Sequence, residues 1–182
     1  MLILLITLGV ALLGLALYAG AVSVTYASTI TIAETLPNNT GSAADASRIV
    51  THNQYNESGT YTAATTPPVT LQASFLQALS AGAATIDLRA LTGTNGASVD
   101  GNGLKVQMVR VKNLGANALT VKSGASNGHT GFFTATTGTI IPPGAHMQLF
   151  TNDNGDDIDA THKTWDLTGT GAQTSEWTIV MG

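Results

Sequence analysis

The sequence predicts an all-β protein, an antiparallel β-sandwich or jelly-roll-like domain preceded by a hydrophobic N-terminal helix or signal segment. Three observations support this prediction. Apolar and polar residues alternate along many short segments, which places one face of each strand on a core. Turn residues separate about ten such segments at spacings of roughly 8–12 residues, as in sandwiches and jelly rolls. Charged residues are only 10% of the chain, and Ala, Thr and Gly replace them, as in tightly packed β proteins.

Length and composition also exclude several classes of function. The 182 residues are enough for one well-buried core, with or without an appendage. A net charge of −4 argues against a general nucleic-acid-binding surface, so no nucleic-acid partner is predicted. The chain has no cysteine, which excludes a disulfide framework, a thiolate metal site and a cysteine nucleophile.

The first 21 residues form a separate hydrophobic segment. Met1–Ala21 is nearly all apolar, and about 20 such residues are enough to span a bilayer as a helix. Three interpretations remain open: a secretory signal peptide, an uncleaved membrane anchor, or upstream sequence before a biological start near Val22 or Val24. The predicted organisation is therefore a hydrophobic segment at residues 1–21 and a β-sandwich domain at residues 22–182.

The N-terminal part of that domain contains strands separated by polar loops. Val22–Ala33 alternates regularly and predicts a first strand that ends near Leu36 and Pro37. A turn-rich loop follows, and the prolines at 67 and 68 interrupt the chain further on. Between these breaks, two further short strands are predicted at Arg48–His52 and Gly59–Ala63.

The segment Val69–Leu79 fits two structures. Alternation of apolar residues favours a strand, whereas Leu71, Phe75 and Leu79 at four-residue spacing favour a short helix. We predict a strand that runs into one helical turn. Thr85–Leu88 is the next strand, and the Asn-Gly and Asp-Gly pairs in Thr92–Gly103 predict turns.

The chain is organised around Leu104–Val121, which reads as two strands joined by the turn Asn113–Asn117. The alternation changes phase at Met108–Val109, which predicts either a β-bulge or a strand that is covered on both faces. Five of the seven basic residues lie between Arg89 and Lys122, so this region carries most of the positive charge.

Short strands are also predicted in the C-terminal part of the chain. The prolines at 142 and 143 and the glycine at 144 form a corner between two of them. The predicted strands are Phe132–Thr134, Thr139–Ile141, His146–Thr151, Lys163–Leu167 and Ser175–Met181.

Two groups of side chains are candidates for contact with a partner. Arg110, Lys112 and Lys122 carry positive charge on strands of the central region. Trp165 and Trp177 lie in the closing strands and would stack on a sugar ring if they lined one exposed face. Each tryptophan has apolar neighbours two residues away, so packing in the core is the alternative interpretation.

The acidic loop Asn152–Asp159 is the one candidate metal site. Asp153, Asp156, Asp157 and Asp159 supply carboxylate oxygens, which hard cations such as Ca²⁺ prefer. The spacing differs from that of an EF-hand, and a solvated acidic turn is the alternative. No other cofactor is predicted.

The stretch Gly124–Gly128 has the form G-x-S-x-G, but a hydrolase elbow needs a helix after the serine. The residues that follow have no helical periodicity, so we interpret Ser126 as part of a turn and expect no catalytic residue. The four histidines show no ligand spacing.

Several phrases of this sequence resemble small β-rich proteins encoded among the structural genes of tailed bacteriophages and related mobile elements. They are TIDLRALTGTNGASVDGNGLKVQMVRVKN, LTVKSGASNG, IIPPGAHMQLFTND and KTWDLTGTGAQTSEWTIVMG, with TITIAETLPNNTGSAADASRIVTHN upstream. The resemblance covers about residues 22–182 and rests on turn motifs that other sandwiches also use. It implies a virion-associated assembly component, whereas Met1–Ala21 is a departure from such proteins.

Two classes of function follow as expectations. The first is a non-enzymatic structural protein of a virion, either decorating the capsid or associated with a fibre, that contacts itself or other virion proteins and forms homo-oligomers. The second is a secreted or membrane-anchored binding module for carbohydrate or a cell-surface ligand. The expected location is the virion or the extracellular space, and a membrane only if residues 1–21 are retained.

Overall fold

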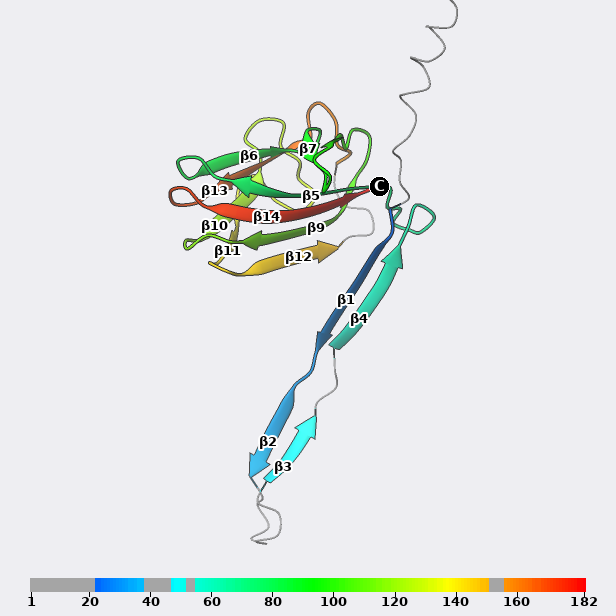
Figure 1. Cartoon of the computed structure of the whole chain (residues 1–182), viewed down its shortest axis with the longest axis vertical. Helices are drawn as coiled ribbons and strands as arrows, with labels where there is room; N and C mark the ends of the chain where they lie inside the picture. The colour runs from blue at the N-terminus through cyan, green and yellow to red at the C-terminus, as the bar shows by residue number, and fades with distance from the viewer. Residues whose placement is uncertain (1–21, 38–46, 52–54, 151–155) are drawn as a thin grey trace, which may run out of the picture.

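The computed structural model describes residues 22–37, 47–51, 55–150 and 156–182. Within these residues all regular secondary structure is β, and neighbouring strands in each sheet are antiparallel. Two four-stranded sheets pack against each other, and a narrow arm of paired strands projects from them (Figure 1). The predicted all-β, antiparallel class is confirmed. The hydrophobic segment at residues 1–21 lies outside the described residues.

Each four-stranded sheet takes its strands from distant parts of the sequence. The front sheet has the order β12-β9-β14-β5, with β5 at Leu71–Ala78, β9 at Val106–Asn113, β12 at His146–Phe150 and β14 at Thr174–Met181. The back sheet has the order β11-β10-β13-β6, with β6 at Ala83–Asp87, β10 at Leu119–Ser123, β11 at Thr139–Ile141 and β13 at Thr164–Thr168. A small hairpin, β7 (Leu91–Thr92) with β8 (Ser98–Val99), lies beside β5. None of the described residues forms a helix that would be long and apolar enough to cross a membrane.

The central segment does not form the hairpin that its sequence predicts. Strand β9 pairs with β12 and β14, while β10 pairs with β11 and β13, so residues 114–118 cross from one sheet to the other. The side chain of Asn113 holds this crossover. Its amide nitrogen Nδ2 donates to the carbonyl oxygens of Asn117, Ile141 and Pro142 at 2.7, 3.0 and 3.2 Å, and its Oδ1 accepts from the Gly115 N–H at 2.9 Å.

The predicted irregularity in β9 has both of the expected causes. Val180 pairs with Met108 but Met181 pairs with Val106, so Gln107 is an extra residue that bulges from the strand. The strand is also covered on both faces at this end, because Val106 lies in the main core whereas Met108 lies in a second apolar cluster under the arm. One additional residue thus accounts for the change of phase in the sequence.

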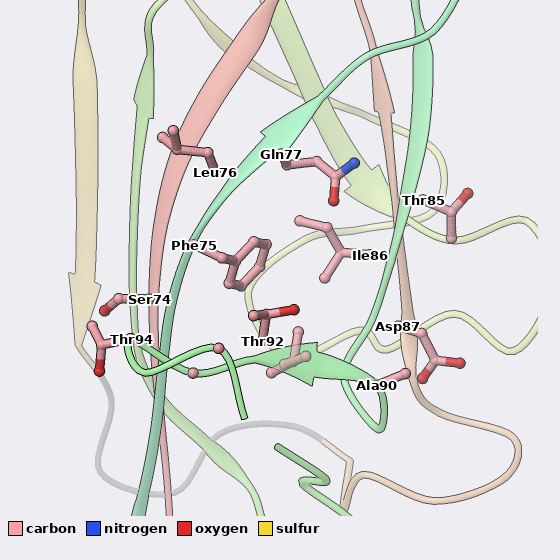
Figure 2. A pocket seen from close by; sticks show the side chains of 13 residues that line it. Ser74, Phe75, Leu76, Gln77, Thr85, Ile86, Asp87, Ala90, Thr92 and Thr94 are labelled. Carbon is pink, nitrogen blue, oxygen red and sulfur yellow. The ribbon is translucent and has the colours of Figure 1, made fainter. Parts of the chain in front are cut away.

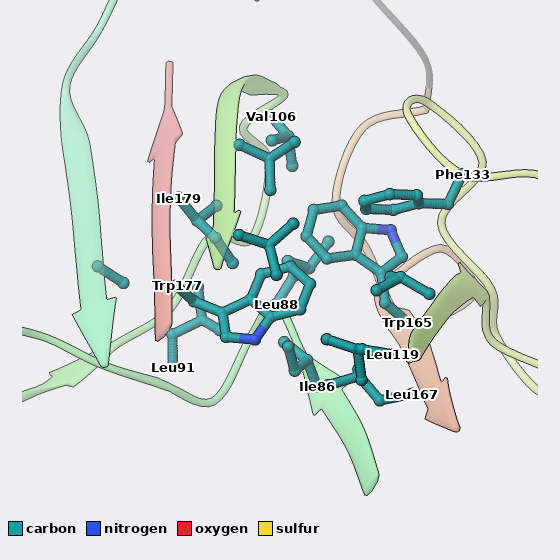
Figure 3. Close-up of a cluster of buried hydrophobic side chains, with 14 of the residues drawn as sticks. Ile86, Leu88, Leu91, Val106, Leu119, Phe133, Trp165, Leu167, Trp177 and Ile179 are labelled. Carbon is teal, nitrogen blue, oxygen red and sulfur yellow. The ribbon is translucent and has the colours of Figure 1, made fainter. Parts of the chain in front are cut away.

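The main core lies between the two sheets and is centred on two tryptophans (Figure 3). The rings of Trp165 on β13 and Trp177 on β14 are stacked with centroids 6.0 Å apart, so they join the two sheets directly. Phe133 meets the Trp165 ring edge-on at 5.0 Å. Both indole N–H groups are satisfied in the interior, Trp165 by the His129 carbonyl oxygen and Trp177 by the Ser175 hydroxyl.

The arm is the part of the structure that the sequence did not separate from the sandwich. Strand β1 (Val24–Ile30) pairs with β4 (Tyr55–Tyr61), and β2 (Ala33–Pro37) pairs with β3 (Ser47–Thr51), in ribbons of two strands. Figure 1 shows these ribbons running away from the sandwich one after the other. The strand predicted at Val22–Ala33 is therefore interrupted between β1 and β2 and does not join either four-stranded sheet.

The root of the arm packs on the outer face of the front sheet. The Tyr26 ring lies 4.2 Å from the Phe150 ring, centroid to centroid, and stacks with Tyr61 at 5.7 Å. Tyr61, Phe150 and Val24 pack against the second apolar cluster, which comprises Val69, Met108 and Val180. The hydrogen bond with Tyr61, desolvation and the hydrogen bond to Glu57 together raise the pKa of Tyr26 to about 12.

Two shorter predictions need correction. Val69–Leu79 contains a strand that continues to Ala78, and no helical turn follows it. Phe132–Thr134 is not a strand but part of a loop, because Phe133 turns inward to pack on Trp165. In both places the apolar pattern predicts burial, but the backbone conformation differs from the predicted one.

Candidate protein interaction surfaces

A groove lies along the open side of the sandwich, where the edge strands β5 and β6 face each other (Figure 2). Its volume is about 570 Å³. Apolar side chains line it, including half-buried Phe75, exposed Leu76 and the core residues Ile86 and Leu91. The inner part of the groove therefore reaches side chains of the hydrophobic core.

The β7–β8 hairpin closes one side of this groove. Its turn contains Asn95 and Gly96, and Gly96 has a φ of +77°, which favours glycine at this position. The Gln72 side chain on β5 donates from Nε2 to the Thr94 hydroxyl at 3.2 Å and so ties the hairpin to the strand. Behind the hairpin, a second hollow of about 430 Å³ shares Gly93 and Thr94 with the groove and extends it toward the start of β5.

Asp87 is the one ionisable side chain in the lining of the groove. Burial alone would raise the pKa of its carboxyl group, but hydrogen bonds from the Lys163 ammonium and the Arg89 N–H outweigh this effect and lower it. The Lys163 Nζ lies 2.8 Å from the carboxylate. Because its charge is already paired, the groove is suited to an uncharged or apolar occupant rather than to a cation.

The edge of β5 beside the groove lacks a strand partner among the described residues. Strand β5 pairs with β14 only, and the Leu79 N–H donates to the Gln173 carbonyl oxygen at the end of that pairing. Backbone groups in an antiparallel pair alternate in direction, so those of Gln72, Ser74 and Leu76 point away from β14. The Leu76 side chain is 66% exposed at the same edge.

The predicted basic residues do not gather in one place. Arg110 and Lys112 lie on β9 in the front sheet, whereas Lys122 lies on β10 in the back sheet. Arg110 forms an ion pair with Glu176 on the neighbouring strand, and this hydrogen bond lowers the pKa of the Glu176 carboxyl group. Their role in contacting a partner remains a prediction, now as two separate surfaces.

The two tryptophans cannot contact a ligand in this structure. Trp165 and Trp177 are both 0% exposed, with their rings between the sheets. The structure therefore corrects their proposed place on an exposed, sugar-binding face and supports the alternative interpretation, packing in the core. Inward alternation on the central strands β13 and β14 is the physical reason.

The carboxylates of the acidic loop have separate partners. Asp156 accepts from the Thr130 hydroxyl, Asp157 lies 4.0 Å from the Lys105 ammonium, and Asp159 accepts from the Thr161 and His162 N–H groups. The bonds from Thr161 are the main reason that the pKa of Asp159 is lowered. Among the described residues no three such side chains form a metal-binding group. Asp153 lies outside the described residues, and Ca²⁺ binding remains a prediction.

The G-x-S-x-G stretch is a turn fastened to β13. The Thr164 hydroxyl donates to the Ser126 carbonyl oxygen, and the Lys163 and Thr164 N–H groups donate to the Asn127 carbonyl oxygen. Asn127 has a φ of +53°, as a tight turn requires. No helix follows in this described part of the chain, so the structural context of a nucleophile elbow is absent there.

One buried ionisable residue, His129, was not singled out from the sequence. It is 0% exposed, and its ring Nε2 lies 2.9 Å from the Asp156 carbonyl oxygen. Because a carbonyl oxygen only accepts, Nε2 carries the proton of the neutral ring. Desolvation is the main cause that lowers the pKa of His129, nearby His162 lowers it further, and Asp156 opposes the shift.

The buried His129 predicts a loss of stability in mild acid. Its folded pKa is lowered, so below the unfolded pKa of about 6.5 the unfolded chain binds a proton first and stability falls as the pH falls. The expected slope is up to ~1.4 kcal/mol per pH unit, continuing down to the folded pKa. Urea denaturation between pH 8 and pH 5 measures it. His129→Gln is expected to reduce the slope, and His146→Gln, at an exposed position on β12, to retain it; equal slopes in the wild type and His129→Gln would contradict the prediction.

Sequence reasoning missed the groove because its lining comes from β5, β6 and the β7–β8 hairpin, which no local pattern brings together. It missed the arm because β1 alternates as a core strand does.

In comparisons with known proteins, no family model, no curated protein and no solved structure matches this chain.

Proposed function

We propose that this protein is a non-enzymatic structural subunit of a repeating protein assembly, specifically a capsid-decorating or fibre-associated component of a bacteriophage virion. The observation that carries the assembly proposal is the projecting arm with its exposed isoleucines. Ile30 and Ile32 are each 56% exposed at the end of β1 and just beyond it. The virion itself is proposed from the sequence resemblance alone.

The construction of the arm favours a role in contacts between molecules. An isolated two-stranded hairpin is marginally stable in water, and the described ribbons have two strands each. Such a ribbon gains stability when another chain adds to its edge or covers its apolar face. The root is already fixed by Tyr26 on Phe150, so the remainder of the arm is held out toward a neighbour.

The alternative function, a secreted or anchored carbohydrate-binding module, required Trp165 and Trp177 to be exposed. Both tryptophans lie in the core rather than on a flat face. No other described feature favours it, so we retain the assembly subunit, with the virion or the extracellular space as its proposed location.

The test of this proposal is the association state of the protein and its dependence on the arm. Sedimentation over a range of concentrations is expected to show stable oligomers of the wild type. Ile30→Asp should weaken association at least about tenfold, because an isoleucine contributes ~1.5–3 kcal/mol when buried and a carboxylate resists burial. Ala27→Asp introduces the same charge on the opposite face of β1 and should have a smaller effect.

Two results would overturn the proposal. One is a wild type that stays monomeric at high concentration. The other is an oligomer that neither substitution weakens, because association would then not involve the arm.

A further inference from the structure

We propose that the arm of one copy docks in the groove of a second copy, where a strand of the arm extends the front sheet at the free edge of β5. This inference rests on the proposed assembly function and identifies the partner as a second copy of this chain. The contact is directional, from the arm of one molecule to the groove of the next.

The first argument is that the apolar face of the arm continues past the contact that it already makes. On this face Val24 packs against the second apolar cluster of the same molecule, and the partly buried Tyr26 packs on the Phe150 ring. Ile30 lies on the same face, beyond the exposed Ser28, and is 56% exposed. The apolar face of β1 is therefore covered by its own molecule near Val24 and is left exposed near Ile30.

The second argument is that the groove offers the arm strand two things: backbone hydrogen-bond partners and an apolar surface. The β5 edge presents outward backbone donors and acceptors at Gln72, Ser74 and Leu76, and strand addition satisfies such groups. Phe75 and Ile86 in the groove provide an apolar surface for a side chain such as Ile30. The charge of Asp87 is paired with Lys163 and does not oppose an apolar occupant.

The lengths of the two elements also match. Strands β1 and β4 have seven residues each, and β5 has eight. At about 3.3 Å per residue these correspond to roughly 23 and 26 Å, so one arm strand is long enough to pair along the part of the β5 edge that the β7–β8 hairpin leaves open.

The third argument concerns direction. Strands β5 and β12 are opposite edges of the front sheet, and the arm leaves the molecule on the β12 side (Figure 1). The arm thus points away from the groove of its own molecule and toward that of another. A donor and an acceptor on opposite edges form a head-to-tail contact, which closes into rings or continues as a filament.

The chain contains no cysteine, which makes a crosslinking test direct. One set of molecules carries Ile30→Cys, and a second set, distinguishable by mass, carries Leu76→Cys. The two sets are mixed, allowed to exchange and treated with a short bis-maleimide, which tolerates a shift in strand register. Intact-mass analysis then counts mixed and like pairs.

Ile140→Cys is the matched control for Leu76→Cys, because both side chains are 66% exposed on edge strands, β11 and β5 respectively. Mixed Ile30–Leu76 pairs should exceed mixed Ile30–Ile140 pairs at least about fivefold. They should also exceed Ile30–Ile30 pairs. Before crosslinking, Leu76→Cys and Ile140→Cys are both expected to remain oligomeric in sedimentation; a loss of oligomers in Leu76→Cys alone would also support a contact at the β5 edge.

The outcomes separate this inference from the function on which it rests. Oligomers that yield mainly Ile30–Ile30 pairs would show that arms pair with arms and would overturn the inference alone. Oligomers with equal Leu76 and Ile140 pairing would overturn it too. A monomeric wild type would overturn both proposals.

Discussion

Substitution of Asn113 by aspartate is expected to destabilise the protein by about 3–5 kcal/mol at pH 7. The Asn113 side chain is 0% exposed, and its amide nitrogen donates to three carbonyl oxygens. A carboxylate in the same place directs a negative charge at those three oxygens and removes the donor that they share, although the Pro142 oxygen still accepts from the Ala145 N–H. The change adds no bulk, so the loss comes from electrostatics and hydrogen bonding.

Urea denaturation followed by circular dichroism measures this loss. The folded state should raise the pKa of the introduced carboxyl group, so the variant should regain part of its stability as the pH falls toward the unfolded value of about 3.9. Asn117→Asp is the matched control, because that side chain is exposed, and it should change stability by less than about 0.5 kcal/mol. A loss of the same size in both variants would contradict the role given to Asn113.

Replacing Trp165 by alanine is expected to cost about 3–5 kcal/mol, because it leaves a cavity between the two sheets. The ring contacts Trp177 from the other sheet, the edge of Phe133 and the ring of His129. Its N–H also satisfies the carbonyl oxygen of His129 at 3.1 Å. The surrounding strands are paired on both sides and have little freedom to collapse into the space.

Trp165→Phe is the control that separates ring packing from the hydrogen bond. It keeps an aromatic ring but loses the indole N–H, so a smaller loss of about 1–3 kcal/mol is expected. The unfolding transition should be followed by circular dichroism, since fluorescence changes with the tryptophan itself. An alanine variant as stable as the phenylalanine variant would show that the ring does not hold the sheets together.

Alternation in the sequence predicted strands well but not the sheet to which each strand belongs. Strands β9 and β10 alternate as a hairpin would, yet residues 114–118 connect two different sheets. The decisive residue is Asn113, which in the sequence is an ordinary turn former and in the structure is a buried donor to three carbonyl groups. Only three-dimensional proximity reveals that role.

The candidate interaction surface was harder to predict than the fold. The same alternation of residues occurs in a strand that packs on a core and in one that projects from it. Ile30 and Val24 therefore look alike in the sequence, although their exposure differs. The tryptophans illustrate the reverse case, because their inward positions on β13 and β14 follow from alternation, and packing in the core was an open alternative from the start. The groove beside β5 depends on contacts between segments far apart in the chain, and local patterns carry no information about them.

The positions of β13 and β14 also determine when this protein can fold during its synthesis. Among the described strands, β6 pairs only with β13 and β5 pairs only with β14. Ser74 and Thr178, which are hydrogen-bonded across β5 and β14, are 104 positions apart. A nascent chain that has not yet exposed residues 164–181 outside the ribosome therefore holds two early strands without partners in their sheets. Unpaired strands of this kind are prone to pairing with other chains, and both sheets are completed only after residues 164–181 have emerged.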